Sequence, residues 1–210
     1  MKRNSINIAV LVSGGGTNLQ ALIDAEAAGS LHSGRIALVI SNKEGAYALT
    51  RANAAGIPTA VVTGSAAGGA AGAEARMEEL LTAHQIDLII LAGFLSILSP
   101  AFAAKYDHRI LNIHPSLIPA FCGAGFYGLR VHEAALARGV KVTGATVHFV
   151  NEIPDGGEII LQKAVRVRKS DTPESLQKRV MHEAEWKILP AAAEAVSAKI
   201  LREENKHEHL

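Results

Sequence analysis

The sequence has few of the residues that build disulfides, metal centres or membrane spans. It contains a single cysteine, Cys122, which rules out an internal disulfide and any zinc site with several cysteines. No apolar run is long enough to cross a bilayer, and the basic start of the chain leads directly into a strand-like segment instead of a signal peptide. We therefore expect a cytoplasmic protein with no membrane partner.

The chain also lacks an excess of charge of either sign. It has 21 Lys and Arg against 20 Asp and Glu, a formal net charge of +1, so nothing favours a nucleic-acid partner. Hydrophobic residues make up 49% and charged residues 20%, which is typical of a folded globular protein. A chain of 210 residues can bury one sizeable core. We expect one domain over residues 1–210, as a monomer or homodimer.

Short β-branched runs alternate with helical segments along most of the chain. The strand-like runs lie at residues 6–13, 36–41, 58–63, 86–91 and around 110. This alternation predicts an α/β fold with an open, doubly wound, mostly parallel sheet. Two later runs, 142–150 and 158–167, are joined by a segment too short for a helical crossover, so we expect an antiparallel pair.

Three further segments carry local signals. Asp171-Thr-Pro-Glu174 is a strong helix start, and the helix should run to about Leu189, where Pro190 ends or kinks it. An Ala-rich helix and a charged tail should follow. The Gly/Ala segment Gly64–Gly72 has little to fix a conformation, and we expect a mobile loop there.

Asn112 and His114 form the most informative pair of polar residues. They lie two apart on a short predicted strand that Pro115 ends, so their side chains should point to the same face. An amide donor beside an imidazole suits a reaction in which a carbonyl oxygen becomes negative while a proton moves nearby. An isolated Asn-x-His is more often structural, so the interpretation depends on the rest of the chain.

The glycine-rich segment Gly14–Asn18 lies between the first strand and the first helix. Glycines there allow a ligand to approach the backbone, free N–H groups at a helix start favour an anion, and Thr17 and Asn18 add donors. The segment matches neither the P-loop nor the dinucleotide fingerprint. Phosphate binding and a tight turn without a ligand both remain open.

Other candidate residues depend on how the strands pack. Asp155 lies in a turn where Asp is common for conformational reasons. If the late strands pack beside the strand of His114, however, its carboxylate would raise the imidazole pKa and fix the ring orientation. We expect His148 to be a strand residue and His132 to lie at a helix surface. The segment Leu91–Leu98 could wall a flat heterocycle or form ordinary core.

Taken together, five motifs resemble the phosphoribosylglycinamide formyltransferases, the folate-dependent enzymes of purine biosynthesis. They are Ser13–Asn18, Leu91–Phe94, Leu98–Phe102, Asn112–Leu117 and Asp155–Gly157, in family order from Ile6 to about Pro190. The resemblance implies the formyltransferase fold, with a phosphate- and nucleotide-binding half (1–100), a catalytic and folate-binding half (101–190), and a C-terminal helix and tail (191–210).

The resemblance also implies a role for each matching residue. Gly16, Thr17 and Asn18 would hold the phosphate of glycinamide ribonucleotide, and Glu185 would lie near its amine. Asn112 would stabilise the oxyanion, His114 would assist charge stabilisation and proton transfer, and Asp155 would tune His114 and order a water. The formyl donor would be 10-formyltetrahydrofolate, with no metal. Asn112 would also contact the folate, whose pocket would be lined by Leu95, Ser96, Ile97 and Leu98.

The chain departs from the family pattern in three places. Ser96 stands where members often carry Arg, and the Gly/Ala loop near Ala70 has no basic residue, because Arg76 is expected on the following helix. The loop Ala120–Gly128 is longer than in shorter members and could form a different lid.

The main alternative function is a formyltetrahydrofolate hydrolase, in which water replaces the amine. Such enzymes usually carry an N-terminal regulatory domain, for which we see no room before Ile6. A methionyl-tRNA formyltransferase would need a C-terminal RNA-binding domain and a basic surface. A non-catalytic binding protein would not need Asn112, His114 and Asp155 together.

Overall fold

The computed structural model describes residues 3–207, so the ends of the predicted 1–210 unit lie outside the described part. Its centre is a seven-stranded sheet of order β3-β2-β1-β4-β5-β6-β7. The first five strands are parallel, while β6 runs antiparallel to β5 and β7 antiparallel to β6. This confirms the predicted doubly wound, mostly parallel sheet and its antiparallel pair. The strands are β1 (Ile6–Val12), β2 (Gly34–Ser41), β3 (Thr59–Val61), β4 (Leu88–Leu91), β5 (Ile110–His114), β6 (Val142–Phe149) and β7 (Ile159–Arg166).

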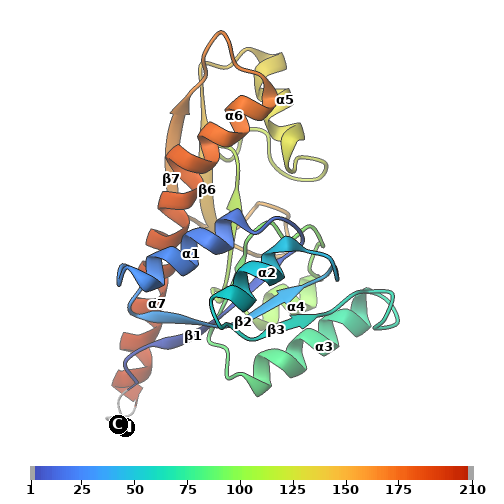
Figure 1. The fold of residues 1–210 in the computed structure, drawn as a ribbon, viewed down its shortest axis with the longest axis vertical. Coiled ribbons are helices and arrows are strands. Elements are labelled where there is room, and N and C mark those ends of the chain that lie inside the picture. Colours follow the sequence, from blue (N-terminus) through green and yellow to red (C-terminus); the bar gives the residue numbers. More distant parts are fainter. Residues whose placement is uncertain (1–2, 208–210) are drawn as a thin grey trace.

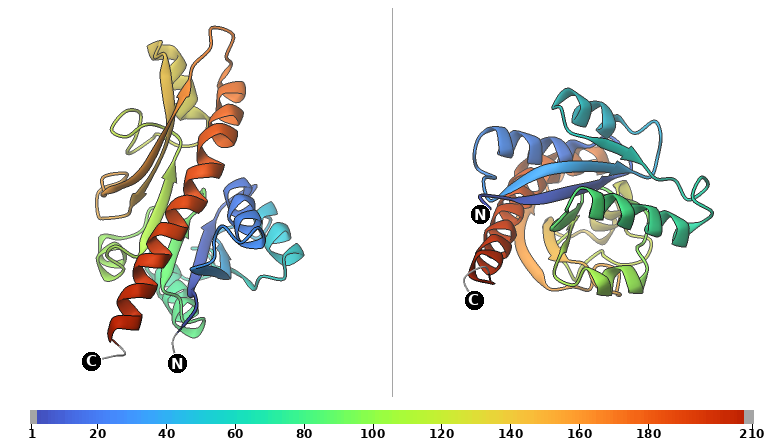
Figure 2. Two further views of the ribbon diagram at one scale, coloured as in Figure 1. Left: turned by 90° about the vertical axis from the view of Figure 1, so that its left-hand side faces the viewer. Right: turned by 90° about the horizontal axis from the view of Figure 1, so that it is seen from below.

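Helices cover both faces of this sheet (Figures 1 and 2). The long C-terminal helix runs beside the sheet and ends near the start of the first strand (Figure 2). Within residues 3–207, no helix combines the length and apolar character that a membrane span requires. The helices are α1 (Thr17–Ala27), α2 (Tyr47–Ala54), α3 (Ala70–Ala83), α4 (Pro100–Lys105), α5 (Leu129–Arg138), α6 (Pro173–Val180) and α7 (Trp186–His207), with a π-helical turn at Met181–Glu185.

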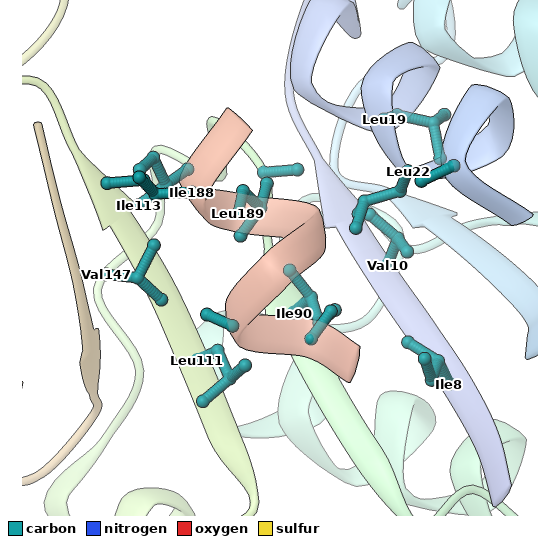
Figure 3. Close-up of a cluster of buried hydrophobic side chains, with 14 of the residues drawn as sticks. Ile8, Val10, Leu19, Leu22, Ile90, Leu111, Ile113, Val147, Ile188 and Leu189 are labelled. Carbon is teal, nitrogen blue, oxygen red and sulfur yellow. The ribbon is translucent and has the colours of Figure 1, made fainter. Parts of the chain in front are cut away.

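Successive side chains of a strand point to opposite faces of the sheet, so the buried residues form two clusters, one on each face. In β1, Ile8 and Val10 belong to one buried cluster, whereas Ala9 and Leu11 belong to the other. The first cluster is closed by α1 and α7, whose Leu22 and Leu189 are fully buried with Ile8 and Val10 (Figure 3). The second is closed by α3 and α4. Full burial of both faces explains the continuous apolar runs of the central strands.

The strand order creates a crevice at one edge of the sheet. The chain passes from β1 outward to β2 and β3 and then returns to β4 on the other side of β1. The loops that leave the carboxyl ends of β1 and β4 therefore diverge, and ligands of open α/β sheets bind at such a point.

Two local predictions were wrong. The expected loop Gly64–Gly72 ends earlier, because α3 begins at Ala70, where alanines have the strongest helix preference. Pro190 neither ends the helix nor precedes a second one, since it lies inside α7. The alternative, that it kinks the helix, stays a prediction. The π-helical turn lies just upstream, and Trp186, four residues before the proline, has ψ of −6°. That departure from helical geometry falls where the proline ring would otherwise meet the carbonyl of Trp186.

Candidate active site

A cleft of about 700 Å³ opens at the carboxyl ends of β1, β4 and β5. It brings together every predicted site residue except Leu98, which packs instead against the buried cluster that contains Phe102. Its wall is formed by Gly14–Asn18, Ala92–Ile97, Asn112–Pro115, Gly123–Gly128 and Pro154–Asp155, with His132, Gln177, Met181 and Glu185. Residues far apart in the sequence thus face one space.

The β1–α1 loop presents backbone to this cleft. Gly16 is the N-cap residue of α1 with φ of 71°, and no side chain in the described part of the chain caps the helix. The N–H groups of the first turn are therefore free to bind an anion. A Cβ at Gly16 would lie 2.6 Å from Cβ of Ala48. Both this close approach and the positive φ therefore favour glycine at the position. Arg51 of α2 supports the loop from behind through Nε, which donates to the Gly15 carbonyl at 2.8 Å.

Asn18 and Glu185, which lie 167 positions apart, form a buried pair at the edge of the cleft. Asn18 Nδ2 donates to Glu185 Oε2 at 2.7 Å, and Glu185 is only 4% exposed. Burial raises the pKa of the Glu185 carboxyl to about 7, although the Asn18 hydrogen bond opposes the rise. Near neutral pH, Glu185 can therefore either donate or accept a proton.

The segment after β4 supplies an apolar wall. Leu95 and Ile97 are 55% and 78% exposed, so the alternative that they belong to the ordinary core is wrong. The backbone N–H of Leu95 donates to Ser13 Oγ at 2.8 Å, which ties this segment to the β1–α1 loop. Ser96 Oγ accepts a hydrogen bond from Asn42 Nδ2 at 2.8 Å.

His114 and Asp155 face each other, with His114 Nδ1 3.4 Å from Asp155 Oδ2. Burial lowers the pKa of the His114 imidazole, and the Asp155 charge opposes this without overcoming it. Asp155 thus raises the His114 pKa as predicted, but the net change in that pKa is a fall. For Asp155, burial raises the carboxyl pKa, but the imidazoles of His148 and His114 and the Gly123 N–H outweigh it and lower that pKa. Asp155 is therefore ionised at neutral pH.

The long loop Ala120–Gly128 bonds directly to this pair. His114 Nε2 lies 2.9 Å from the Phe121 carbonyl, and the Gly123 N–H donates to Asp155 Oδ2 at 2.8 Å. Cys122 lies between them, and burial raises the pKa of its thiol, which disfavours the reactive thiolate. The loop therefore helps to hold the imidazole and the carboxylate in place.

Two histidines that the sequence left aside also belong to the cleft region. His148 was expected to be a strand residue; it is one, on β6, and its Nε2 lies 3.1 Å from Asn112 Nδ2 and 3.5 Å from Asp155 Oδ1. His132 was expected at a helix surface, which is wrong: it has no exposed area, and burial, with His114, lowers its pKa to about 4. The place of His148 in the site follows only from the β5–β6 pairing, which sets Asn112 opposite His148. Within residues 3–207, no group of three or more His, Cys, Asp or Glu side chains could hold a metal ion.

Comparison with known proteins matches residues 6–193 to the formyl transferase family. The phosphoribosylglycinamide formyltransferase of Haemophilus influenzae is 43% identical over 183 residues, which cover 87% of this chain and 83% of that protein. The trifunctional purine biosynthetic protein adenosine-3 of Gallus gallus is 44% identical over 198 residues, 94% of this chain but 19% of that protein. The chain thus spans about a fifth of its trifunctional relatives.

Solved structures give the same result. Glycinamide ribonucleotide transformylase 1 from Symbiobacterium toebii superposes with a TM-score of 0.86 at 42% identity, covering 93% of this chain and 89% of that one. The resemblance inferred from the five motifs is therefore confirmed, and the family implies a folate-derived formyl donor. A family match over residues 6–193, which include all seven strands, and relatives above 40% identity establish that this chain belongs to the formyl transferase family.

Proposed function

We propose that the protein transfers the formyl group of 10-formyltetrahydrofolate to the amine of glycinamide ribonucleotide, in the de novo synthesis of purines. The observation that carries this proposal is the convergence of three different surfaces on one cleft. These are the uncapped helix start at Gly16, the apolar wall at Leu95 and Ile97, and the polar group of Asn112, His114 and Asp155. Two substrates, one phosphorylated and one with a flat ring system, need these surfaces.

In this proposal, the two substrates enter from opposite sides of the polar group. The ribonucleotide phosphate accepts hydrogen bonds from the first turn of α1, at Gly16, Thr17 and Asn18, where the helix dipole also favours negative charge. The folate ring lies against Leu95–Ile97, and Leu98 supports that segment from the core side. The proposed division of the chain into a nucleotide-binding half and a folate-binding half stays a prediction, as do the cytoplasmic location and the oligomeric state.

The chemical step is a transfer from nitrogen to nitrogen. The amine attacks the formyl carbon, and the carbonyl π electrons move to oxygen, which becomes an oxyanion that an Asn112 N–H stabilises. The carbon–N10 bond then breaks as the oxyanion collapses. The amine loses one proton and N10 gains one, so the overall step is balanced without an external acid or base.

His114 and Asp155 serve the movement of this proton. Burial keeps the His114 pKa low, so the imidazolium that forms when His114 takes up a proton releases it readily. The ionised Asp155 stabilises this imidazolium while it exists. Glu185, with its pKa near 7, can accept a proton from the attacking amine. All of these groups lie along the same cleft.

A direct assay tests the proposal. Purified protein is mixed with 10-formyltetrahydrofolate, with and without glycinamide ribonucleotide, and release of deformylated folate is followed by absorbance. Release that depends on the ribonucleotide is the expected result. Release without it would replace the proposal by the hydrolase function, and no release in either mixture would contradict both.

A further inference from the structure

His148 is a buried titratable residue that the proposed chemistry leaves without a role. It is the second-to-last residue of β6, is 1% exposed, and stands directly opposite Asn112 of β5. Directly paired residues on adjacent strands point to the same face, so the imidazole and the amide meet at the end of the sheet where the cleft opens. Three atoms of neighbouring groups lie close enough to His148 to determine its protonation.

The first of these atoms fixes one ring nitrogen. His148 Nδ1 lies 2.7 Å from the carbonyl oxygen of Phe149, and a carbonyl can only accept. Nδ1 therefore carries a proton. In a neutral imidazole the other nitrogen, Nε2, is then an acceptor.

The contacts of Asn112 require the same arrangement. Asn112 Nδ2 lies 3.1 Å from His148 Nε2 and 3.3 Å from Asp155 Oδ1. Asp155 is an ionised acceptor, so the amide must turn its NH₂ end toward it, because the flipped amide would set two acceptor oxygens together. A proton on Nε2 would then meet an N–H of Asn112. Of the two neutral tautomers, only the one with the proton on Nδ1 satisfies these three hydrogen-bond contacts. It leaves His148 Nε2 without a proton for Asp155 Oδ1, which lies farther away at 3.5 Å.

We infer that His148 is a positioning residue for the amide of Asn112, an inference that rests on the proposed function. In the free protein both N–H groups of Asn112 are engaged, one by His148 and one by Asp155. When the oxyanion forms, the N–H at the longer 3.3 Å contact turns from Asp155 to the substrate oxygen. The shorter bond to His148 then holds the nitrogen end at the reacting carbon. Without this acceptor the amide can rotate and present its own oxygen to the oxyanion.

Substitution of His148 should therefore lower turnover more than binding. We expect His148→Phe, which keeps a ring but removes both nitrogens, to reduce kcat roughly 10- to 100-fold, with either KM changed less than about threefold. This is less than the loss from deleting an oxyanion donor outright. His148→Gln, whose side-chain oxygen can accept from Asn112, should recover part of the rate. Thr143→Val on the same strand, with a buried hydroxyl that has no partner among residues 3–207, is the matched control and should leave kcat unchanged.

A double-mutant cycle separates positioning from a general structural effect. If His148 acts through Asn112, adding His148→Phe to Asn112→Ala should cost less than about twofold further. Additive losses, an unchanged kcat in His148→Phe, or a change confined to KM would each overturn the inference.

Nitrogen NMR of the free, ¹⁵N-labelled protein tests the inference without any turnover. We expect the neutral imidazole of His148 to carry its proton on Nδ1 and to leave Nε2 unprotonated. A proton on Nε2 would overturn the positioning role whatever the activity. Loss of ribonucleotide-dependent transfer in the wild-type protein, with the expected tautomer present, would instead contradict the proposed function.

Discussion

The two walls of the cleft are built from different parts of the polypeptide. The wall at the β1–α1 loop is backbone: a left-handed glycine, an uncapped helix start and a supporting arginine behind. The wall at the ends of β5 and β6 is made of side chains, in which Asn112, His114, His148 and Asp155 contact one another. Backbone N–H groups offer a fixed binding surface, whereas titratable side chains can change charge during a reaction. We therefore expect the first wall to govern binding and the second to govern turnover.

The largest effects should come from the side-chain wall. Asn112→Ala and His114→Ala should each lower kcat roughly 100- to 1,000-fold, because an oxyanion donor or a proton carrier is lost. His108→Ala, which removes a histidine 54% exposed in its side chain, is the control and should change kcat little. Activity within a few-fold of wild type in either cleft variant would contradict the assignment of the site.

Asp155→Asn should reduce kcat by about 100-fold and should lower the His114 pKa further. The Asp155 charge raises that pKa against the effect of burial, so its removal leaves burial unopposed. NMR titration of His114 measures the shift. Asp107→Asn, which changes the exposed partner of His108, should leave both quantities unaltered. A His114 pKa that rises in Asp155→Asn would show that the two groups do not interact as the structure indicates.

Glu185 lies where the two walls meet, and it should make stability depend on pH. Its pKa is about 7 in the folded protein against an ordinary 4.5, so the folded state binds more protons between these values. The free energy of unfolding should therefore fall as pH rises from about 4.5 to about 7 and then level off, by roughly 2–3 kcal/mol.

Urea denaturation of the wild type and of Glu185→Gln at pH 5 and pH 8 measures this contribution. Glu185→Gln should lose most of the pH dependence, whereas Glu183→Gln on the same π-helical turn should retain it. If the free energy of unfolding changed equally between pH 5 and pH 8 in the wild type and in Glu185→Gln, Glu185 would not be desolvated in the folded protein.

The smallest expected effect belongs to the backbone wall. Gly16→Ala should raise KM for the ribonucleotide about tenfold and change kcat less than threefold, because the added methyl group displaces the helix start from the phosphate. Gly29→Ala is a close control, with φ of 72° and, among residues 3–207, no atom within 4 Å of the added Cβ. If Gly16→Ala lowered kcat and left KM unchanged, the division between binding and turnover would be wrong.

The backbone wall and the sheet could be predicted from the sequence because their signals are local. A strand-like run followed by Gly14–Asn18 and a helical pattern predicts a glycine-rich turn that leads into a helix. The alternation of strands and helices predicts the fold class. Asn112 and His114 were found for the same reason, since two residues on one strand share a face whatever surrounds them.

Other features depend on contacts between distant residues, which a local pattern does not contain. His148 joins the site only because β6 pairs with β5 in one register, and a shift of one residue would turn it to the other face. His132 is buried by the packing of α5 over the cleft, and the fall in the His114 pKa follows from burial that the sequence does not state. The helix that continues past Pro190 depends on a local change at Trp186, which has no sequence signature.

The central claim is that the amine of the ribonucleotide accepts the formyl carbon in this cleft. The most direct test supplies 10-formyltetrahydrofolate labelled with ¹³C in the formyl group, together with glycinamide ribonucleotide, and analyses the ribonucleotide by mass spectrometry and NMR. The account predicts that the label appears as a formamide on the glycinamide nitrogen, and that Asn112→Ala largely removes this product. Label recovered only as free formate would contradict the account.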